Sequence, residues 1–137
     1  MGMVYAEITL KNYCDEVQVN TGVIKPEDIR TATVTAMVDT GSMNLVITEE
    51  LCQKLGLAIK GKKPTQVASG HKVMCKVTDV VEVCWKNRET YLPALVVPGT
   101  EQVLLGAIPL EIMDLTVNPC TQELVGVHGD EIEYIVF

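Results

Sequence analysis

The sequence predicts a mostly β protein, a closed barrel with one or two short helices that forms a single domain over residues 1–137. Two observations predict this class. Hydrophobic residues make up 47% of the chain but aromatic residues only 4%, so the core is built from aliphatic side chains, many of them β-branched, which favour strands. Short apolar or alternating segments separated by turn residues also recur along the chain, as in β barrels.

The N-terminal part predicts two strands joined by a polar connection. Apolar residues alternate with polar ones over 4–11, which is typical of a half-buried strand. Residues 12–29 carry Asn, Asp, Gly and Pro among few apolar residues and predict a loop with room for one short strand at most. The alternation returns over 31–38, where the strand becomes apolar on both faces before it ends at Asp39.

A short strand and a short helix are predicted next. Residues 44–47, Asn-Leu-Val-Ile, are mostly apolar and predict a buried strand. Thr48 is a suitable N-cap for a helix that ends at Gly56. Residues 60–64, Lys-Gly-Lys-Lys-Pro, predict a solvated basic loop.

The middle of the chain predicts a hairpin followed by longer strands. Ser69-Gly70 is a turn signal between strand-like flanks. The strand pattern continues to Val83 and resumes over 91–97, where Pro93 indicates a sheet edge or a bulge.

The C-terminal part begins with an apolar strand over 103–106. Pro109 opens a short helix in which Ile108, Ile112 and Leu115 share one face. The remaining predicted elements are strands at 115–117 and 123–127, a turn at 128–130 and a strand-like tail at 131–137.

Charge and composition exclude several function classes. Eleven basic and eighteen acidic residues give a net charge of −7, which argues against nucleic acid and anionic membranes as partners. The five cysteines are an odd number without Cys-x-x-Cys spacing, and the two histidines are scattered, so we expect no disulfide framework, no metal and no cofactor. The N-terminus lacks a signal-like region and no apolar run could span a bilayer, so we expect a cytoplasmic protein.

The most informative motif is Asp39-Thr40-Gly41-Ser42, which follows the apolar residues 36–38. It places a carboxylate where a core strand turns sharply. A carboxylate in apolar surroundings must be paired, hydrogen-bonded or protonated, because a bare buried charge is costly. Such an aspartate is either a capping residue of the turn or an acid–base group with a tuned environment.

With these motifs, the sequence resembles the retropepsin-type aspartic proteases, in particular the small single-domain bacterial relatives of the retroviral enzymes. The resemblance covers roughly residues 31–127. It depends on four features in the family's order: the strand into Asp39-Thr40-Gly41, the strand and helix after it, the hairpin at 68–70, and the Leu-Leu-Gly at 104–106 before a terminal helix.

The resemblance implies that Asp39 is the catalytic carboxylate of an aspartic peptidase. The sequence departs from the family's pattern in an insertion at 12–29 and an extension at 128–137. The resemblance further implies roles for Thr40, Gly41 and Ser42 in the active-site turn, Ala68, Ser69 and Gly70 in a flap over the substrate, and Leu104, Leu105 and Gly106 as support of the active-site loop.

Hydrolysis of a peptide without a metal or a covalent nucleophile needs a carboxylate that activates water and a second carboxyl group that protonates the carbonyl oxygen. The chain has one Asp-Thr-Gly. Asp79 and Glu82 lie in a segment that is typical of a solvent face, and Asp114 lies in the short helix. The second carboxyl group is therefore expected from Asp39 of another copy, in a homodimer with a two-fold axis.

Under this interpretation the substrate is an extended protein or peptide segment, bound to the flap by strand addition. An alternative from another class is a catalytically silent dimer of the same fold that binds peptides without cleaving them, because a fold does not guarantee an activity.

Other hydrolase chemistries are less well supported by the sequence. Neither serine, Ser42 or Ser69, lies in a Gly-x-Ser-x-Gly motif. A cysteine hydrolase using Cys75 with His71 or His128 stays an alternative, although free cysteines are more often small buried apolar residues.

Overall fold

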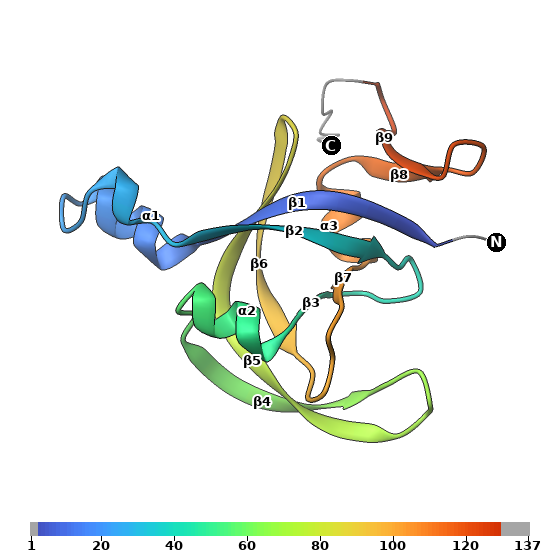
Figure 1. Ribbon diagram of the computed structural model, residues 1–137, viewed down its shortest axis with the longest axis horizontal. Coiled ribbons are helices and arrows are strands. Elements are labelled where there is room, and N and C mark those ends of the chain that lie inside the picture. Colours follow the sequence, from blue (N-terminus) through green and yellow to red (C-terminus); the bar gives the residue numbers. More distant parts are fainter. Residues whose placement is uncertain (1–2, 130–137) are drawn as a thin grey trace, which may run out of the picture.

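The computed structural model describes residues 3–129, whose arrangement is shown in Figure 1. Nine strands and three short α-helices, with one 3₁₀ turn, are assigned in this range. In chain order they are β1 (Val4–Asn12), α1 (Tyr13–Asn20), η1 (Pro26–Asp28), β2 (Thr31–Val38), β3 (Leu45–Ile47), α2 (Glu49–Lys54), β4 (Ile59–Gln66), β5 (Lys72–Trp85), β6 (Arg88–Val96), β7 (Val103–Leu105), α3 (Ala107–Ile112), β8 (Leu115–Asn118) and β9 (Glu123–Gly126).

Six strands close into a barrel in the order β1-β2-β7-β3-β6-β5, and the pairing of β5 with β1 completes the ring. The β2–β7 and β3–β6 pairs are parallel, whereas the other pairs are antiparallel. The predicted fold class, a mostly β closed barrel with few short helices, is thereby confirmed. β4 lies outside the ring and pairs only with β5 among the described strands, so that the β4–β5 hairpin extends from the barrel (Figure 1).

The barrel interior is filled by the aliphatic residues that the composition predicts. β1 has the burial pattern of an alternating strand, with Ile8 and Leu10 almost fully enclosed. Leu45, Ile47 and Leu105 of the short central strands are also fully buried. Burial of each such side chain contributes about 1.5–3 kcal/mol, and the short central strands that carry the site are thus firmly seated.

The prediction of a loop at 12–29 is wrong, because this segment contains α1 and η1. The Asn12 side chain caps α1 by accepting the N–H of Asp15 at 3.1 Å, and Asp15 and Glu16 lie in the first turn, where the helix dipole favours negative charge. α1 lacks a strong apolar stripe, because only Asp15 of the helix is fully buried. A helix of this kind has no hydrophobic periodicity in its sequence, so the pattern of apolar residues could not predict it.

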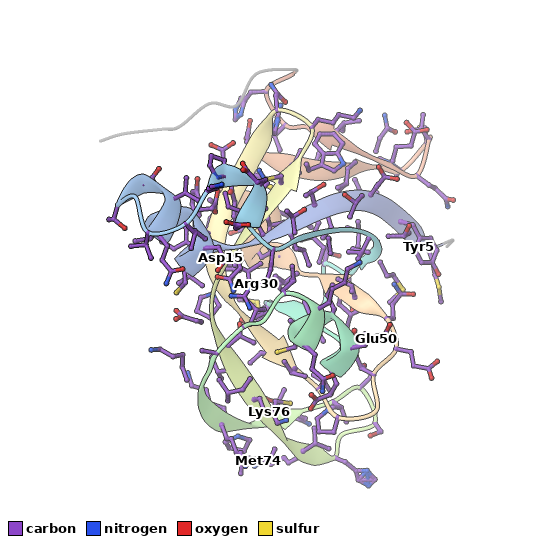
Figure 2. The ribbon with its side chains drawn as sticks, turned by 60° about the vertical axis from the view of Figure 1, so that its left-hand side comes forward. Tyr5, Asp15, Arg30, Glu50, Met74 and Lys76 are labelled. Carbon is purple, nitrogen blue, oxygen red and sulfur yellow. The ribbon has the colours of Figure 1, made fainter. Side chains whose placement is uncertain are left out.

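An ion pair closes the insertion onto the barrel. Arg30, just before β2, donates from Nε and Nη2 to the two carboxylate oxygens of Asp15, each at 2.9 Å, and its backbone N–H donates to Asp15 at 2.9 Å. Figure 2 shows the two side chains meeting below α1. These hydrogen bonds hold the pKa of Asp15 below its usual value.

The basic segment 60–64 is not the predicted loop but most of β4. It pairs with β5 in antiparallel register, for example Lys63 opposite Cys75 and Pro64 opposite Met74. Nearly all of β4 is exposed. Because a strand at the edge of a sheet is specified by its partner rather than by its own burial, charge and Pro64 masked it in the sequence.

Several further sequence expectations can be compared with the structure. The Thr48 cap is confirmed, since its hydroxyl accepts the N–H of Leu51 at 3.1 Å. An irregularity at Pro93 is confirmed by a register shift of β5 against β6 between Val77 and Val80. The strands predicted near 115–117 and 123–127 are β8 and β9, which form a separate hairpin. The predicted tail 131–137 lies outside the described residues.

The predicted apolar face of α3 is wrong. Ile108 and Ile112 are exposed, whereas Pro109 and Leu110 are the buried residues of the helix. Asp114 follows the helix instead of lying in it, and has a positive φ of 57°. The helix is only six residues long, so a shift of its buried face by about one residue exposes the residues that were predicted to be buried.

The described part of the chain has no helix long and apolar enough to cross a membrane. All five cysteines are free thiols. Within residues 3–129, no group of three His, Cys, Asp or Glu side chains is arranged to hold a metal ion.

Candidate active site

Asp39 lies at the end of β2, in a turn held by backbone hydrogen bonds. Its N–H donates to the carbonyl of Leu105 in the neighbouring parallel strand β7 at 3.0 Å. The N–H of Gly41 donates to the Asp39 carboxylate at 3.0 Å, and the N–H of Ser42 to the Asp39 carbonyl at 3.0 Å. The half-buried carboxylate is thereby fixed in direction by its own turn.

The segment after β7 holds the other side of this turn. The N–H groups of Gly106 and Ala107 donate to the carbonyls of Asn44 and Ser42 at 3.0 and 2.7 Å. Ile108 donates to Met43 at 3.0 Å in the same way. Residues 42–44, which follow Asp39, are therefore fastened to the β7–α3 connection.

A cavity of about 640 Å³ opens beside Asp39. It runs between the active-site turn, the end of β4 and the β6–β7 connection. Its lining residues are Asp39, Gly41, Ser42, Met43, Asn44, Val46, Thr65, Gln66, Val67, Ala68, Leu95, Val97, Thr100 and Leu104. We call this cavity the groove. Its walls are largely apolar, and Asp39 is the only charged residue among the described residues that line it.

The structure brings some of the predicted site residues to the groove and leaves others out. Asp39, Gly41, Ser42, Ala68 and Leu104 line it. The remaining predicted residues lie apart from it: Thr40 is exposed, Ser69 and Gly70 form the tip of the hairpin, and Leu105 and Gly106 are buried behind the turn.

The hairpin over the groove is a tight turn. Val67 and Gly70 form its two backbone hydrogen bonds, with Val67 donating to His71 and Gly70 donating to Val67, both at 2.9 Å. Gly70 has a φ of +86°, a conformation that favours glycine. The Ser69-Gly70 hairpin is thus present as predicted; its role as a flap stays a prediction.

The other carboxylates that the sequence brought into question lie elsewhere. Asp79 accepts hydrogen bonds from the Cys14 thiol and the Val80 N–H. The prediction that Glu82 lies on a solvent face is wrong, because this residue is buried and only 7% exposed. The Asp114 carboxylate is hydrogen-bonded to Nδ1 of His128, at 2.9 and 3.0 Å from its two oxygens. None of the three lines the groove.

Of the residues considered for a cysteine hydrolase, Cys75 is buried and His128 is hydrogen-bonded to another side chain. Cys75 is fully buried in β5. His128 is held by the Asp114 carboxylate on the β8–β9 side of the barrel. His71 lies at the exposed tip of the hairpin. This arrangement gives Cys75 no access to substrate.

Sequence reasoning missed most of the groove walls. Val46 comes from β3, Leu95 from β6, and Val97 and Thr100 from the β6–β7 connection. No local motif marks them, since it is the barrel closure that brings these segments together. The end of β4, with Thr65 and Gln66, was the part with a usable signal, because it leads directly into the predicted hairpin.

A closed six-stranded barrel, with an Asp-Thr-Gly turn beneath a β hairpin, defines a protein of the retropepsin-like acid-protease class. Comparison with known families agrees. Residues 17–107, more than half of the chain, match the family model described as aspartyl protease, and the chain belongs to this aspartyl protease family. A search of curated proteins found no match.

Proposed function

We propose that this protein is an aspartic endopeptidase whose active site is assembled by two copies of the chain, with Asp39 from each. The observation that carries the proposal is that Asp39, fixed in a backbone-held turn, is the only carboxylate among the described residues that line a largely apolar groove of about 640 Å³. Membership of the aspartyl protease family supports the protease-type chemistry.

The chemistry requires two carboxyl groups in different protonation states. One activates a water for attack on the peptide carbonyl, and the other protonates the carbonyl oxygen. Two carboxyl groups about 3 Å apart share one proton, because both cannot ionise cheaply, and the dyad of aspartic proteases is the best-known example of this effect. Among the described residues, one chain supplies only the Asp39 carboxylate to the groove, since Asp79, Glu82 and Asp114 lie elsewhere. A two-fold axis beside Asp39 supplies the second group.

The substrate is an extended segment of a protein or peptide. The hairpin lies over the groove, and its strand β4 leads into the groove at Thr65 and Gln66, where the backbone of an extended segment can add to it. Val46, Leu95 and Leu104 provide apolar walls for the side chains beside the scissile bond. Apolar residues at those positions of the substrate are therefore favoured.

The experiment is cleavage of a peptide library by the purified chain over an acid-to-neutral pH range, with a statine-type transition-state mimic as inhibitor. Asp39→Asn abolishes cleavage and leaves the thermal unfolding curve in place. The matched control is Glu50→Gln, which removes an exposed carboxylate of α2 that does not line the groove and retains full activity.

Mixing the two proteins tests the assembly of the site from two chains. Wild type and Asp39→Asn are unfolded together, refolded and assayed at constant total concentration. If each site needs Asp39 from both copies, activity falls as the square of the wild-type fraction. A linear decrease would show that one chain is sufficient.

The second candidate function is a silent dimer that binds extended peptides. The observation that favours it is the groove itself, which is present in a single chain. Under this alternative the wild type cleaves no library peptide at any pH, while labelled apolar peptides bind equally well to wild type and Asp39→Asn.

A further inference from the structure

A second cavity of about 550 Å³ continues the groove beneath β4. The two cavities share the lining residues Asn44, Thr65, Gln66 and Leu95. An extended segment that lies over Asp39 and follows β4 therefore enters this second cavity. We call it the β4 pocket.

Among the described residues, the β4 pocket is lined by a single charged side chain. Lys63 is the only ionisable side chain among the described residues that line it, and most of the others are apolar, including Val77, Leu92, Pro93 and Ile108. Asp39 is likewise the only ionisable side chain that the described residues bring to the groove. The combined channel thus carries one carboxylate at the active-site turn and one ammonium group beneath β4.

The position of Lys63 in the strand directs it toward the channel. Lys63 pairs with Cys75, which is fully buried, and residues opposite each other in an antiparallel pair lie on the same face. Lys62 pairs with Lys76 on the other face, where Lys76 forms an ion pair of 2.9 Å with Glu49 of α2. Lys63 forms no ion pair with any residue in the described range, so its ammonium group is available to a ligand.

The surrounding charge favours an anionic ligand. Between Glu50 and Asp79 the sequence has no acidic residue, although the chain as a whole has a net charge of −7. The same span contains six of the eleven basic residues: Lys54, Lys60, Lys62, Lys63, Lys72 and Lys76. The electrostatic potential of such a cluster of positive charges acts over about 8 Å at physiological salt. The neighbouring lysines of β4 therefore reinforce the charge of Lys63.

We propose that the β4 pocket is a specificity pocket in which Lys63 binds a carboxylate side chain of the substrate, so that the enzyme prefers extended segments with an acidic residue at one position beside the apolar cleavage site. The inference rests on the proposed protease function, because it assigns the β4 pocket to the same bound peptide. The expected substrates are polypeptides with apolar residues at the cleavage site and an acidic residue nearby.

The test uses fluorescein-labelled octapeptides of Val and Leu that carry a single Glu at each position in turn, with the Gln peptides as matched controls. Equilibrium binding is measured by fluorescence anisotropy on the Asp39→Asn variant, so that it does not depend on cleavage. At one position the Glu peptide binds about three- to fivefold more tightly than the Gln peptide, as expected for a partly exposed ion pair, and the preference decreases with added salt.

Two lysine variants separate Lys63 from the general charge of the hairpin. Lys63→Gln removes the difference between the Glu and Gln peptides, and Lys63→Glu reverses it in favour of a peptide with Lys at that position. Lys62→Gln lowers the net charge equally but alters the opposite face of β4, so it keeps the positional preference. Catalysis by the wild-type protein should show the same preference in KM rather than in kcat.

The outcomes separate this inference from the proposed function. Equal binding of Glu and Gln peptides at every position, or equal loss of preference in Lys62→Gln and Lys63→Gln, overturns the assignment of the β4 pocket even if Asp39-dependent cleavage is observed. Tighter binding of the Gln peptides would overturn it too, and would show that the apolar walls, with the aliphatic part of Lys63, select uncharged side chains. Absence of cleavage with a clear Glu preference would refute only the protease function.

Discussion

The backbone N–H of Gly106 donates to the carbonyl of Asn44 at 3.0 Å, and the two residues are in contact backbone to backbone. A Cβ atom at Gly106 would lie 2.5 Å from the Asn44 carbonyl oxygen and 2.6 Å from that of Ser42. These distances are too short for any real side chain. The glycine of the Leu-Leu-Gly motif is therefore explained by the close approach of the active-site turn.

Gly106→Ala should displace the turn that carries Asp39 and lower both stability and activity. We expect a loss of about 2 kcal/mol or more in the free energy of unfolding, with a larger loss in kcat than in KM. Urea unfolding and peptide cleavage measure the two effects. Gly61→Ala is the control, because nothing lies within 4 Å of a Cβ atom there; an equal effect of both changes would contradict the explanation.

The Asp15–Arg30 ion pair should stabilise the barrel at neutral pH. Because Arg30 lowers the pKa of Asp15 from its usual 3.8, the stabilisation is complete above that value and is lost as the pH falls through the lower pKa of the folded state. Asp15→Asn should cost about 1–2 kcal/mol at pH 7, a modest figure because the Arg30 side chain is 51% exposed. Urea unfolding at pH 7 and pH 2.5, with Glu27→Gln as control, should show a larger difference between Asp15→Asn and wild type at pH 7 than at pH 2.5.

Glu16 should make the fold less stable as the pH rises. Burial, together with the hydrogen bond and the charge of Glu82, raises the pKa of Glu16 from 4.5 to about 7. Between these values the folded state binds more protons than the unfolded state, so the free energy of unfolding decreases with increasing pH. After allowance for solvent screening, the decrease from pH 5 to pH 8 is about 1 kcal/mol.

Glu16→Gln removes this titration, so the free energy of unfolding should decrease less over the same range than it does in the wild type. The variant should be more stable than the wild type at pH 8. Chemical denaturation at half-unit intervals of pH measures the effect, with Glu50→Gln as a surface control. A wild-type curve that rises from pH 5 to pH 8 would contradict the prediction.

Arg88 should be essential for the position of α3 and the β8–β9 hairpin. Its guanidinium is almost completely buried and donates to the carbonyls of Met113 and Asp114 at 3.0 and 2.7 Å, and to that of Gly129. Arg88→Lys keeps the charge but loses the planar set of donors, so it should cost about 3 kcal/mol or more. Thermal unfolding compares it with Lys86→Arg on the exposed turn; equal stability of the two variants would be evidence against this role.

The parts of the fold with a strong local pattern could be predicted from the sequence. β1 and β2 alternate clearly, the Asp39 turn follows an apolar strand, and Ser69-Gly70 is a turn signal in itself. These elements are correct because burial of one face, or a residue with special backbone freedom, is visible in neighbouring residues.

The rest depends on partners that are distant in the chain. β4 is a strand only because β5 pairs with it, and α1 depends on the Asn12 cap and on Arg30. The walls of the groove, such as Val46 and Thr100, meet only when the barrel closes. Neither propensity nor hydrophobic periodicity carries such information.

The outer edge of β4 pairs with no strand among the described residues, which has a consequence for the behaviour of the protein in concentrated solution. An uncovered strand edge invites the same edge of another molecule to pair with it, which is a route to fibrous aggregates. Lys60, Lys62 and Pro64 oppose this route by charge repulsion and by the missing N–H of proline. A variant with valines at these positions should therefore lose colloidal stability.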